Sequence, residues 1–198
     1  MSVPEASRRE IQEGRRHQLI DAALALFAEK GYENATIKDL AEACGVAPGL
    51  VYHYFDSKED LLLAVFEKHG FVAEMERVLL PSFDKPASDV LMQVVQGYHD
   101  LLVERESFVR MIVREAMTNP ELEARWTAMC NTGVQTLARY LAARVAAGEL
   151  RPHDTEISAR MLTHPVVVMR LTGGKGELSS IVSCLLDGIT NRRETGKD

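Results

Sequence analysis

The side chains best suited to hydrogen-bond with a partner are Tyr52, His53 and Tyr54, which follow one another in the chain. Each is a ring with a polar group, so each can pack and hydrogen-bond at the same time. The segment around them, Ala43 to Phe55, contains no charged residue. Such a segment is either a buried corner of a core or a surface that contacts a partner.

Two short helices joined by a tight turn are predicted to position these rings. The first begins after Thr36, whose hydroxyl can cap a helix, and Asp39 three residues later completes a capping box. Its apolar positions share one face: Ile37, Leu40, Ala41 and Cys44. Gly45 ends this helix, and Pro48 suits the first turn of the next one. A longer helix before them completes the description of a helix-turn-helix.

The second short helix has two different sides when its residues are placed at about 100° each. Val51 and Phe55 fall on one side, and Val46 leads into it. The opposite side and its flanks carry small, apolar and hydrogen-bonding residues: Gly49, Leu50, Tyr52 and His53. The sequence therefore predicts a packed side and a contacting side.

The rest of the chain also shows helical periodicity. A first helix carries an apolar face, Leu19, Ala22, Ala23, Leu26 and Phe27, and Gly31 follows it as a cap. A fourth helix starts at the capping signal Ser57 to Asp60 and is predicted to continue through Val72. After a break between Pro81 and Pro86, five further helices follow. No window alternates as a strand would, so the fold class is all-α with about nine helices.

Composition indicates a soluble globular protein: 198 residues, 46% hydrophobic and 26% charged, with a net charge of −6. This length suits one or two domains. No apolar run approaches the roughly 20 residues that span a bilayer, and the N-terminus lacks the apolar core of a signal peptide, so we expect a cytoplasmic protein. Cys44, Cys130 and Cys184 are expected to be free thiols, with a redox trigger as the alternative.

Four arginines precede the first apolar stripe, namely Arg8, Arg9, Arg15 and Arg16. They form either a basic arm that contacts phosphate or a solvated helix start, and charge alone does not separate the two.

The segment "TIKDLAEACGVAPGLVYHYFDSKEDLL", preceded by "LIDAALALFAEKGYENAT", resembles the DNA-binding domain of the TetR family of bacterial transcriptional regulators. The resemblance covers roughly Arg16 to Phe66 and rests on Phe27 to Tyr32, the Gly-Val turn, Tyr-x-Tyr-Phe and the Ser-Lys-Glu run. It implies an N-terminal arm and a three-helix DNA-binding domain over residues 1–57. A helical ligand-binding and dimerisation domain would then occupy residues 58–198.

The resemblance also implies roles for single residues. The helix from Pro48 would be the recognition helix in the major groove, and the residues nearest DNA would be Pro48, Gly49, Leu50, Tyr52 and His53. Tyr54 would add a hydroxyl for phosphate, and Thr36 and Lys58 would clamp the DNA backbone. Ala47 departs from the Ser or Thr of many relatives and removes a side-chain cap. The recognition helix also lacks Arg, Lys, Asn and Gln, so DNA shape would carry part of the readout.

Methionines and aromatic residues of the second half suggest a pocket for a hydrophobic or amphipathic molecule. The candidates by helical phase are Phe71, Met75, Val95, His99, Phe108, Met111, Ile112, Trp126, Met129, Cys130, Met161, His164 and Val168. Arg114 and Glu115, with His99 and His164, are candidate polar groups of this pocket. Ordinary core packing is the alternative for each residue, because the same apolar stripe produces both.

A homodimer through the last two helices is a further implication of the resemblance. Small and apolar residues are interleaved there: Ala159, Leu162, Val166 and Met169 on one helix, and Ser179, Val182, Ser183 and Leu186 on the other. Such residues allow helices to approach closely.

The sequence is therefore interpreted as a DNA-binding regulator, a repressor that binds a palindromic operator as a dimer and is released by a small ligand. Control by a protein partner and action as an activator remain open. An enzyme is the rival class, but no G-x-S-x-G, HExxH or phosphate-loop motif occurs. We expect no catalytic residues, metal, cofactor or membrane partner.

Overall fold

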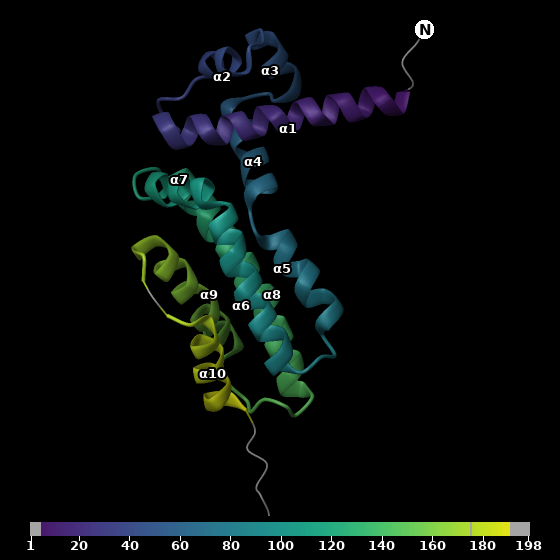
Figure 1. Ribbon diagram of the computed structural model, residues 1–198, viewed down its shortest axis with the longest axis vertical. Coiled ribbons are helices and arrows are strands. Elements are labelled where there is room, and N and C mark those ends of the chain that lie inside the picture. Colours follow the sequence, from purple (N-terminus) through teal and green to yellow (C-terminus); the bar gives the residue numbers. More distant parts are fainter. Residues whose placement is uncertain (1–4, 175, 191–198) are drawn as a thin grey trace, which may run out of the picture. The chain divides into compact units, whose positions relative to one another are not determined.

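The computed structural model describes residues 5–174 and 176–190. These residues form ten α-helices and one 3₁₀ turn, and their strand-like pairing is limited to an isolated bridge between Leu150 and Thr190. The elements are α1 (Glu5–Lys30), α2 (Ile37–Cys44), α3 (Pro48–Tyr54), α4 (Lys58–His69), α5 (Val72–Leu79), η1 (Leu80–Ser82), α6 (Ala87–Glu104), α7 (Glu106–Ala116), α8 (Pro120–Ala146), α9 (Thr155–Thr172) and α10 (Leu178–Ile189). The all-α prediction is confirmed (Figure 1).

The chain divides into two compact units. The N-terminal unit contains the residues up to Gly70 together with Ser107–Glu123, and the C-terminal unit contains Phe71–Glu106 and the residues from Ala124 onward. Contacts thus group α4 and most of α7 with the first three helices. The functional division after residue 57 stays a prediction.

The N-terminal unit is built on the apolar face of α1. Leu19 and Phe27 of this helix are buried, at 0% and 1% exposure, and so are Leu40 of α2 and Leu62 of α4. Figure 1 shows α2 and α3 side by side across α1, in agreement with the contacts of α2 with both helices. The short helices are therefore held by tertiary packing, because isolated helices of seven or eight residues are not stable in water.

The predicted fourth helix is wrong at its C-terminal end. It does not continue through Val72, because α4 ends at His69 and α5 begins at Val72. Gly70 has an extended backbone, with φ −66° and ψ 164°, so the helical hydrogen-bond ladder stops there. This interruption accounts for ten helices where about nine were expected.

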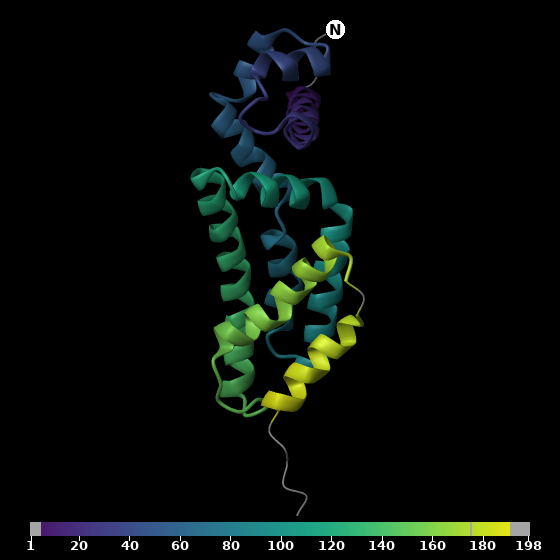
Figure 2. The ribbon, with the colours of Figure 1, turned by 90° about the vertical axis from the view of Figure 1, so that its left-hand side faces the viewer.

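In the C-terminal unit α6 packs against α5, α9 and α10, and Figures 1 and 2 both show α9 and α10 beside α6. Leu91 and Leu102 of α6 are buried with Leu137 and Tyr140 of α8. The hydroxyl of Tyr140 donates to the carbonyl of Lys85 at 2.9 Å, and burial raises the pKa of this phenol to about 12. No helix within the described ranges is long and apolar enough to cross a membrane.

The prediction of which residues form a dimer interface is partly wrong. Ala159, Leu162 and Val166 of α9 are at most 1% exposed within a single chain, and Val182 of α10 is 5% exposed. They are buried because α9 and α10 pack against each other and against α6. The exposed large apolar residues of α9 lie on its other side: Ile157, Met161 and Val168.

Candidate nucleic-acid interface and ligand cavity

The two-sided character predicted for α3 is confirmed. Val51 and Phe55 are buried at 0% and 1% exposure, whereas Tyr52 is 56% exposed. Pro48, Gly49 and His53 are also exposed, and Leu50 and Tyr54 are half-buried. The helix thus presents small, apolar and hydrogen-bonding groups to the outside and anchors itself through its opposite side.

The turn before α3 has the geometry of a helix-turn-helix. Gly45 adopts the left-handed region at φ 64°, which a side chain would strain, and its N–H caps α2. Ala47 begins α3 without a side-chain cap, as expected, and Pro48 occupies the first turn. The ring of His53 lies 5.2 Å from that of Tyr54 in an edge-to-face arrangement.

Thr36 forms the predicted capping box. Its oxygen accepts from the N–H of Asp39 at 3.1 Å, and its own N–H donates to the Asp39 carboxylate at 2.9 Å. The hydroxyl also donates to that carboxylate at 2.6 Å, so the donor expected to contact phosphate is already in use. The Lys30 ammonium, 2.8 Å away, and Thr36 together hold the pKa of Asp39 far below its usual value.

Lys58 was expected to contact the DNA backbone, but its side chain binds carbonyl groups of the protein itself. Its ammonium donates to the carbonyl oxygens of Tyr32 at 2.9 Å, Ala35 at 3.2 Å and Glu33 at 3.3 Å. It also lies 4.3 Å from the centre of the Tyr32 ring. Because an ammonium has three donors, the loop between α1 and α2 engages the whole group. The geometry therefore supports a structural role for Lys58 in place of a phosphate contact.

The fold brings Arg16 close to the end of α3, although helical periodicity does not distinguish Arg16 from the neighbouring arginines. Its guanidinium lies 5.2 Å from the centre of the Phe55 ring, directly after the helix. Arg15 hydrogen-bonds to Gln18 at 3.2 Å. Because α1 already begins at Glu5, the arginine run belongs to a helix start. The side chains of Arg8 and Arg9 lie outside the described residues.

Arg114 and Glu115 line neither cavity of the C-terminal unit described below, contrary to expectation. The guanidinium of Arg114 donates to the carbonyls of Phe27 and Ala28, both at 3.0 Å, at the end of α1. Glu115 accepts from the N–H of Tyr32 at 3.0 Å and from Arg114 at 2.9 Å. A basic group suits helix C-terminal carbonyls, so this pair caps α1 within the N-terminal unit.

A cavity of about 360 Å³ lies in the C-terminal unit. It is lined by Phe71, Met75, Tyr98, Trp126, Thr127, Cys130, Asn131, Gly133, Val134, Arg160, Thr163, His164, Val167 and Val168. Six of these residues are among the sequence candidates: Phe71, Met75, Trp126, Cys130, His164 and Val168. The ring of Phe71 makes edge-to-face contacts with Tyr98 at 5.0 Å and with Trp126 at 6.3 Å.

The remaining candidates do not line this cavity. Phe108, Met111 and Ile112 are buried in the N-terminal unit, and Met161 is 55% exposed. His99 lines a separate hollow of about 190 Å³ beside the end of α9. Val95 and Met129 belong to neither cavity lining. Helical phase finds apolar faces, but it does not distinguish a packed face from one that leaves space.

The charged group of the cavity, Arg160, was missed. Its Nη2 donates to Glu156 at 2.5 Å and to Asn131 at 3.2 Å. Burial, and secondarily Arg160, lowers the pKa of His164, so this imidazole is neutral at pH 7. Burial raises the pKa of the Cys130 thiol to about 11, which keeps it protonated. The spacing of four residues between Arg160 and His164 is the signal that could have placed both on one helix face.

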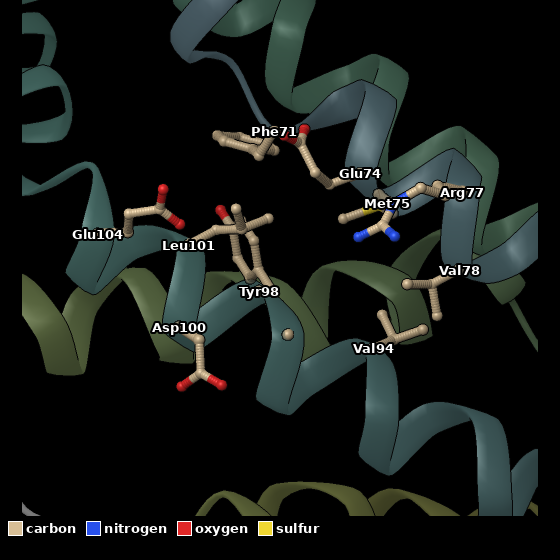
Figure 3. Close-up of a pocket in the computed structure, with 11 residues that line it drawn as sticks. Phe71, Glu74, Met75, Arg77, Val78, Val94, Tyr98, Asp100, Leu101 and Glu104 are labelled. Carbon is tan, nitrogen blue, oxygen red and sulfur yellow. The ribbon is translucent and has the colours of Figure 1, made fainter.

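A second cavity of about 200 Å³ lies between α5 and α6 (Figure 3). It shares Phe71, Met75 and Tyr98 with the first cavity. Figure 3 shows Glu74 and Arg77 of α5 across from Leu101 of α6.

Comparison with known proteins agrees with this architecture. Residues 19–65 match the model of the bacterial regulatory proteins of the tetR family, and residues 89–180 match the model of the AefR-like transcriptional repressor C-terminal domain. The HTH-type transcriptional regulator UidR of Escherichia coli K12 is 28% identical over 158 residues, which cover 74% of this chain and 75% of that protein.

Two further matches come from Bacillus subtilis. Its fatty acid metabolism regulator protein is 27% identical over 187 residues, which cover 88% of this chain and 95% of that protein. The crystal structure of its transcriptional regulator FadR in complex with stearoyl-CoA is 26% identical, has a TM-score of 0.67, and covers 86% of this chain and 95% of that one. With a helix-turn-helix in the first unit and matches across both halves, the chain belongs to the TetR family of bacterial transcriptional regulators.

Proposed function

We propose that the protein is a repressor that binds a palindromic operator in double-stranded DNA as a two-fold dimer and is released by a small apolar or amphipathic effector. The observation that carries the proposal is the two-sided α3, whose outer side exposes Tyr52 and His53 while Val51 and Phe55 fix it in the core. Among the relatives are proteins named as repressors, KstR2 of Rhodococcus jostii and AcnR of Corynebacterium glutamicum.

The exposed side of α3 suits the major groove. Gly49 has no heavy atom within 4 Å of the place where a Cβ would stand, so the backbone can approach DNA closely. Leu50 can contact a thymine methyl, and the polar groups of Tyr52 and His53 can hydrogen-bond to base edges or phosphates. Because α3 has no Arg, Lys, Asn or Gln, sequence-dependent DNA shape contributes to selectivity.

Release by an effector requires that the effector bind the free conformation more tightly than the DNA-bound one. A ligand shifts this equilibrium only by its differential affinity for the two conformations. The cavity of about 360 Å³, largely lined by apolar and aromatic residues, falls in the size range of small-molecule sites. The relative solved with stearoyl-CoA supports an amphipathic effector.

The direct test starts from operator sequences selected from a random DNA pool. Against the selected operator, His53→Ala and Tyr52→Ala should each weaken selective binding by about 1–3 kcal/mol, the usual contribution of a direct base contact. The measurement is operator affinity relative to random DNA, at one salt concentration. Met117→Ala serves as control because Met117 is 83% exposed and lies outside α3. Full selectivity in both α3 variants would refute the assignment of the reading helix.

A further inference from the structure

We propose that the two cavities of the C-terminal unit accept a single elongated ligand, an amphipathic anion. Its head would bind at Arg160 and His164, and its apolar tail would pass the side chains of Phe71, Met75 and Tyr98 into the second cavity. The inference rests on the proposed function of this unit as an effector-binding domain, and it adds the class and the orientation of the effector.

Three side chains border both cavities, namely Phe71, Met75 and Tyr98. They are 4%, 6% and 5% exposed, so each is almost fully packed by its neighbours. Figure 3 shows Phe71 and Met75 coming from the α5 side and Tyr98 from α6. The passage between the cavities therefore depends on whether one of the three can move.

Met75 is the movable member of these three side chains. Its side chain is unbranched and flexible, whereas the rings of Phe71 and Tyr98 hold each other in edge-to-face contact. Gly133 of α8 faces the thioether, and a methyl group built on Gly133 would come within 3.5 Å of the Met75 sulfur. The absence of a side chain at this position leaves the space of one methyl group beside the thioether.

The head is placed in the larger cavity by the guanidinium of Arg160, which forms an ion pair with Glu156 through Nη2 and has two further donor nitrogens. Within the part of the chain that the structure describes, Arg160 uses only Nη2 for hydrogen bonds, so Nε and Nη1 can bind a ligand oxygen. A neutral His164 one turn away can donate to the same group. Hydrogen bonds from a guanidinium to an anion are charge-assisted, so an anionic head suits this end.

The smaller cavity suits a tail and disfavours an anion. Its apolar lining includes Val78, Val94 and Leu101. The charged lining is three acids, Glu74, Asp100 and Glu104, against one cation, Arg77, so its balance is negative. Glu74 forms an ion pair with Arg105, which reduces its charge toward the tail. At about 200 Å³ this cavity is below the usual size of a small-molecule site, whereas it can extend the larger one.

Trp126 provides a direct readout, since it is the single tryptophan of the chain and lines the larger cavity. The experiment titrates the full-length protein, without DNA, with n-alkyl carboxylates of increasing length below their micelle concentrations, and follows tryptophan fluorescence. Each added methylene should raise affinity about fourfold, which corresponds to the ~0.8 kcal/mol of a buried methylene. The rise should continue past the length that fills the larger cavity alone.

Val78→Phe should stop this rise at a shorter chain, because the ring fills the smaller cavity from a half-buried position. For a tail that loses two methylenes of space, affinity should fall by roughly tenfold or more, while short chains bind as to wild type. Met75→Phe, which blocks the passage itself, should have the same effect. Val103→Phe is the matched control, because Val103 is 46% exposed on α6 and lines neither cavity.

The preference for an anionic head group is tested with alkyl trimethylammonium ions of the same chain lengths, which carry a positive head group. Wild type should prefer the carboxylate by about tenfold or more, and Arg160→Met should abolish the preference without changing the dependence on length. A common length limit in wild type and Val78→Phe, a preference for the cation, or no fluorescence response to any chain would each overturn the proposal. Because no DNA is present, these outcomes are separate from operator binding, which the α3 variants test.

Discussion

At the scale of single residues, the ammonium of Lys58, which the sequence predicted to contact DNA, has a structural role. It joins the N-terminus of α4 to the carbonyls of Tyr32, Glu33 and Ala35. These carbonyls lie in the loop that positions α2, so Lys58 links the start of α4 to the helix-turn-helix. Hydrogen bonds that involve a charged partner contribute more to stability than neutral ones.

Lys58→Met should lower the free energy of unfolding by about 1–3 kcal/mol, because it removes the donor to three carbonyls and keeps the aliphatic stem. Urea denaturation measures this change. Lys38→Met is the control: Lys38 lies 3.9 Å from Glu42 and both side chains are largely exposed, so the loss should stay below about 1 kcal/mol. Unchanged stability with a lower salt dependence of operator binding would instead restore the phosphate contact.

At the scale of single helices, the start of α2 combines a capping box with an ion pair. Thr36 and Asp39 satisfy each other's N–H groups, and Lys30 at the end of α1 pairs with the same carboxylate. The cap therefore both begins α2 and connects it to α1. Since α2 braces α3, this network contributes to the orientation of the contacting face.

The pH dependence of stability follows from the lowered pKa of Asp39, which the hydrogen bonds from Lys30 and Thr36 cause. The folded pKa lies below the unfolded one, so the carboxylate stabilises the fold above its ordinary pKa of 3.8. This stabilisation is lost as the pH falls through the folded value.

Asp39→Asn should therefore be less stable than wild type at pH 7, and the difference should shrink as the pH drops below about 4. Denaturation midpoints of both proteins across this range provide the measurement. Glu42→Gln removes a largely exposed carboxylate from the same helix and should show a smaller difference at pH 7. A gap between Asp39→Asn and wild type that does not depend on pH would contradict the argument.

At the scale of the whole molecule, the exposed side of α9 is the surface for the proposed dimer. Ile157 and Met161 are 52% and 55% exposed and lie one turn apart, while the opposite side of α9 is buried in its own chain. In a two-fold dimer each of these residues would lie near the same residue of the other chain. A charge introduced there would therefore face an identical charge across the interface.

Met161→Glu should weaken the dimer at least about tenfold, because two carboxylates would approach each other across the axis. Sedimentation velocity measures the dimer fraction, and operator affinity should fall with it, since two half-sites are then bound independently. Met117→Glu, at an 83% exposed position of the N-terminal unit, should leave both unchanged. A Met161→Glu protein that remains dimeric would locate the interface elsewhere.

Much of the N-terminal half could be predicted from local signals. The capping box at Thr36, the left-handed Gly45, the uncapped Ala47 and the burial of Val51 each depend on residues a few positions apart. The cavity was only partly predictable. Phe71 and Trp126 were found through their residue types, whereas Arg160 resembles any charged residue on a helix until its surroundings are known.

By itself the sequence determined most of the helices and the two-sided character of α3, because periodicity, caps and turn glycines act over a few residues. The family was indicated by the resemblance of the N-terminal segment to known regulators. The tertiary structure alone decided which polar groups are already engaged and which apolar faces leave space. Lys58 is bound by a loop 23–26 residues away, Arg114 caps a helix 86–87 residues away, and three side chains border both cavities. The physical reason is that hydrogen bonds and voids depend on neighbours in space, which local sequence patterns do not specify.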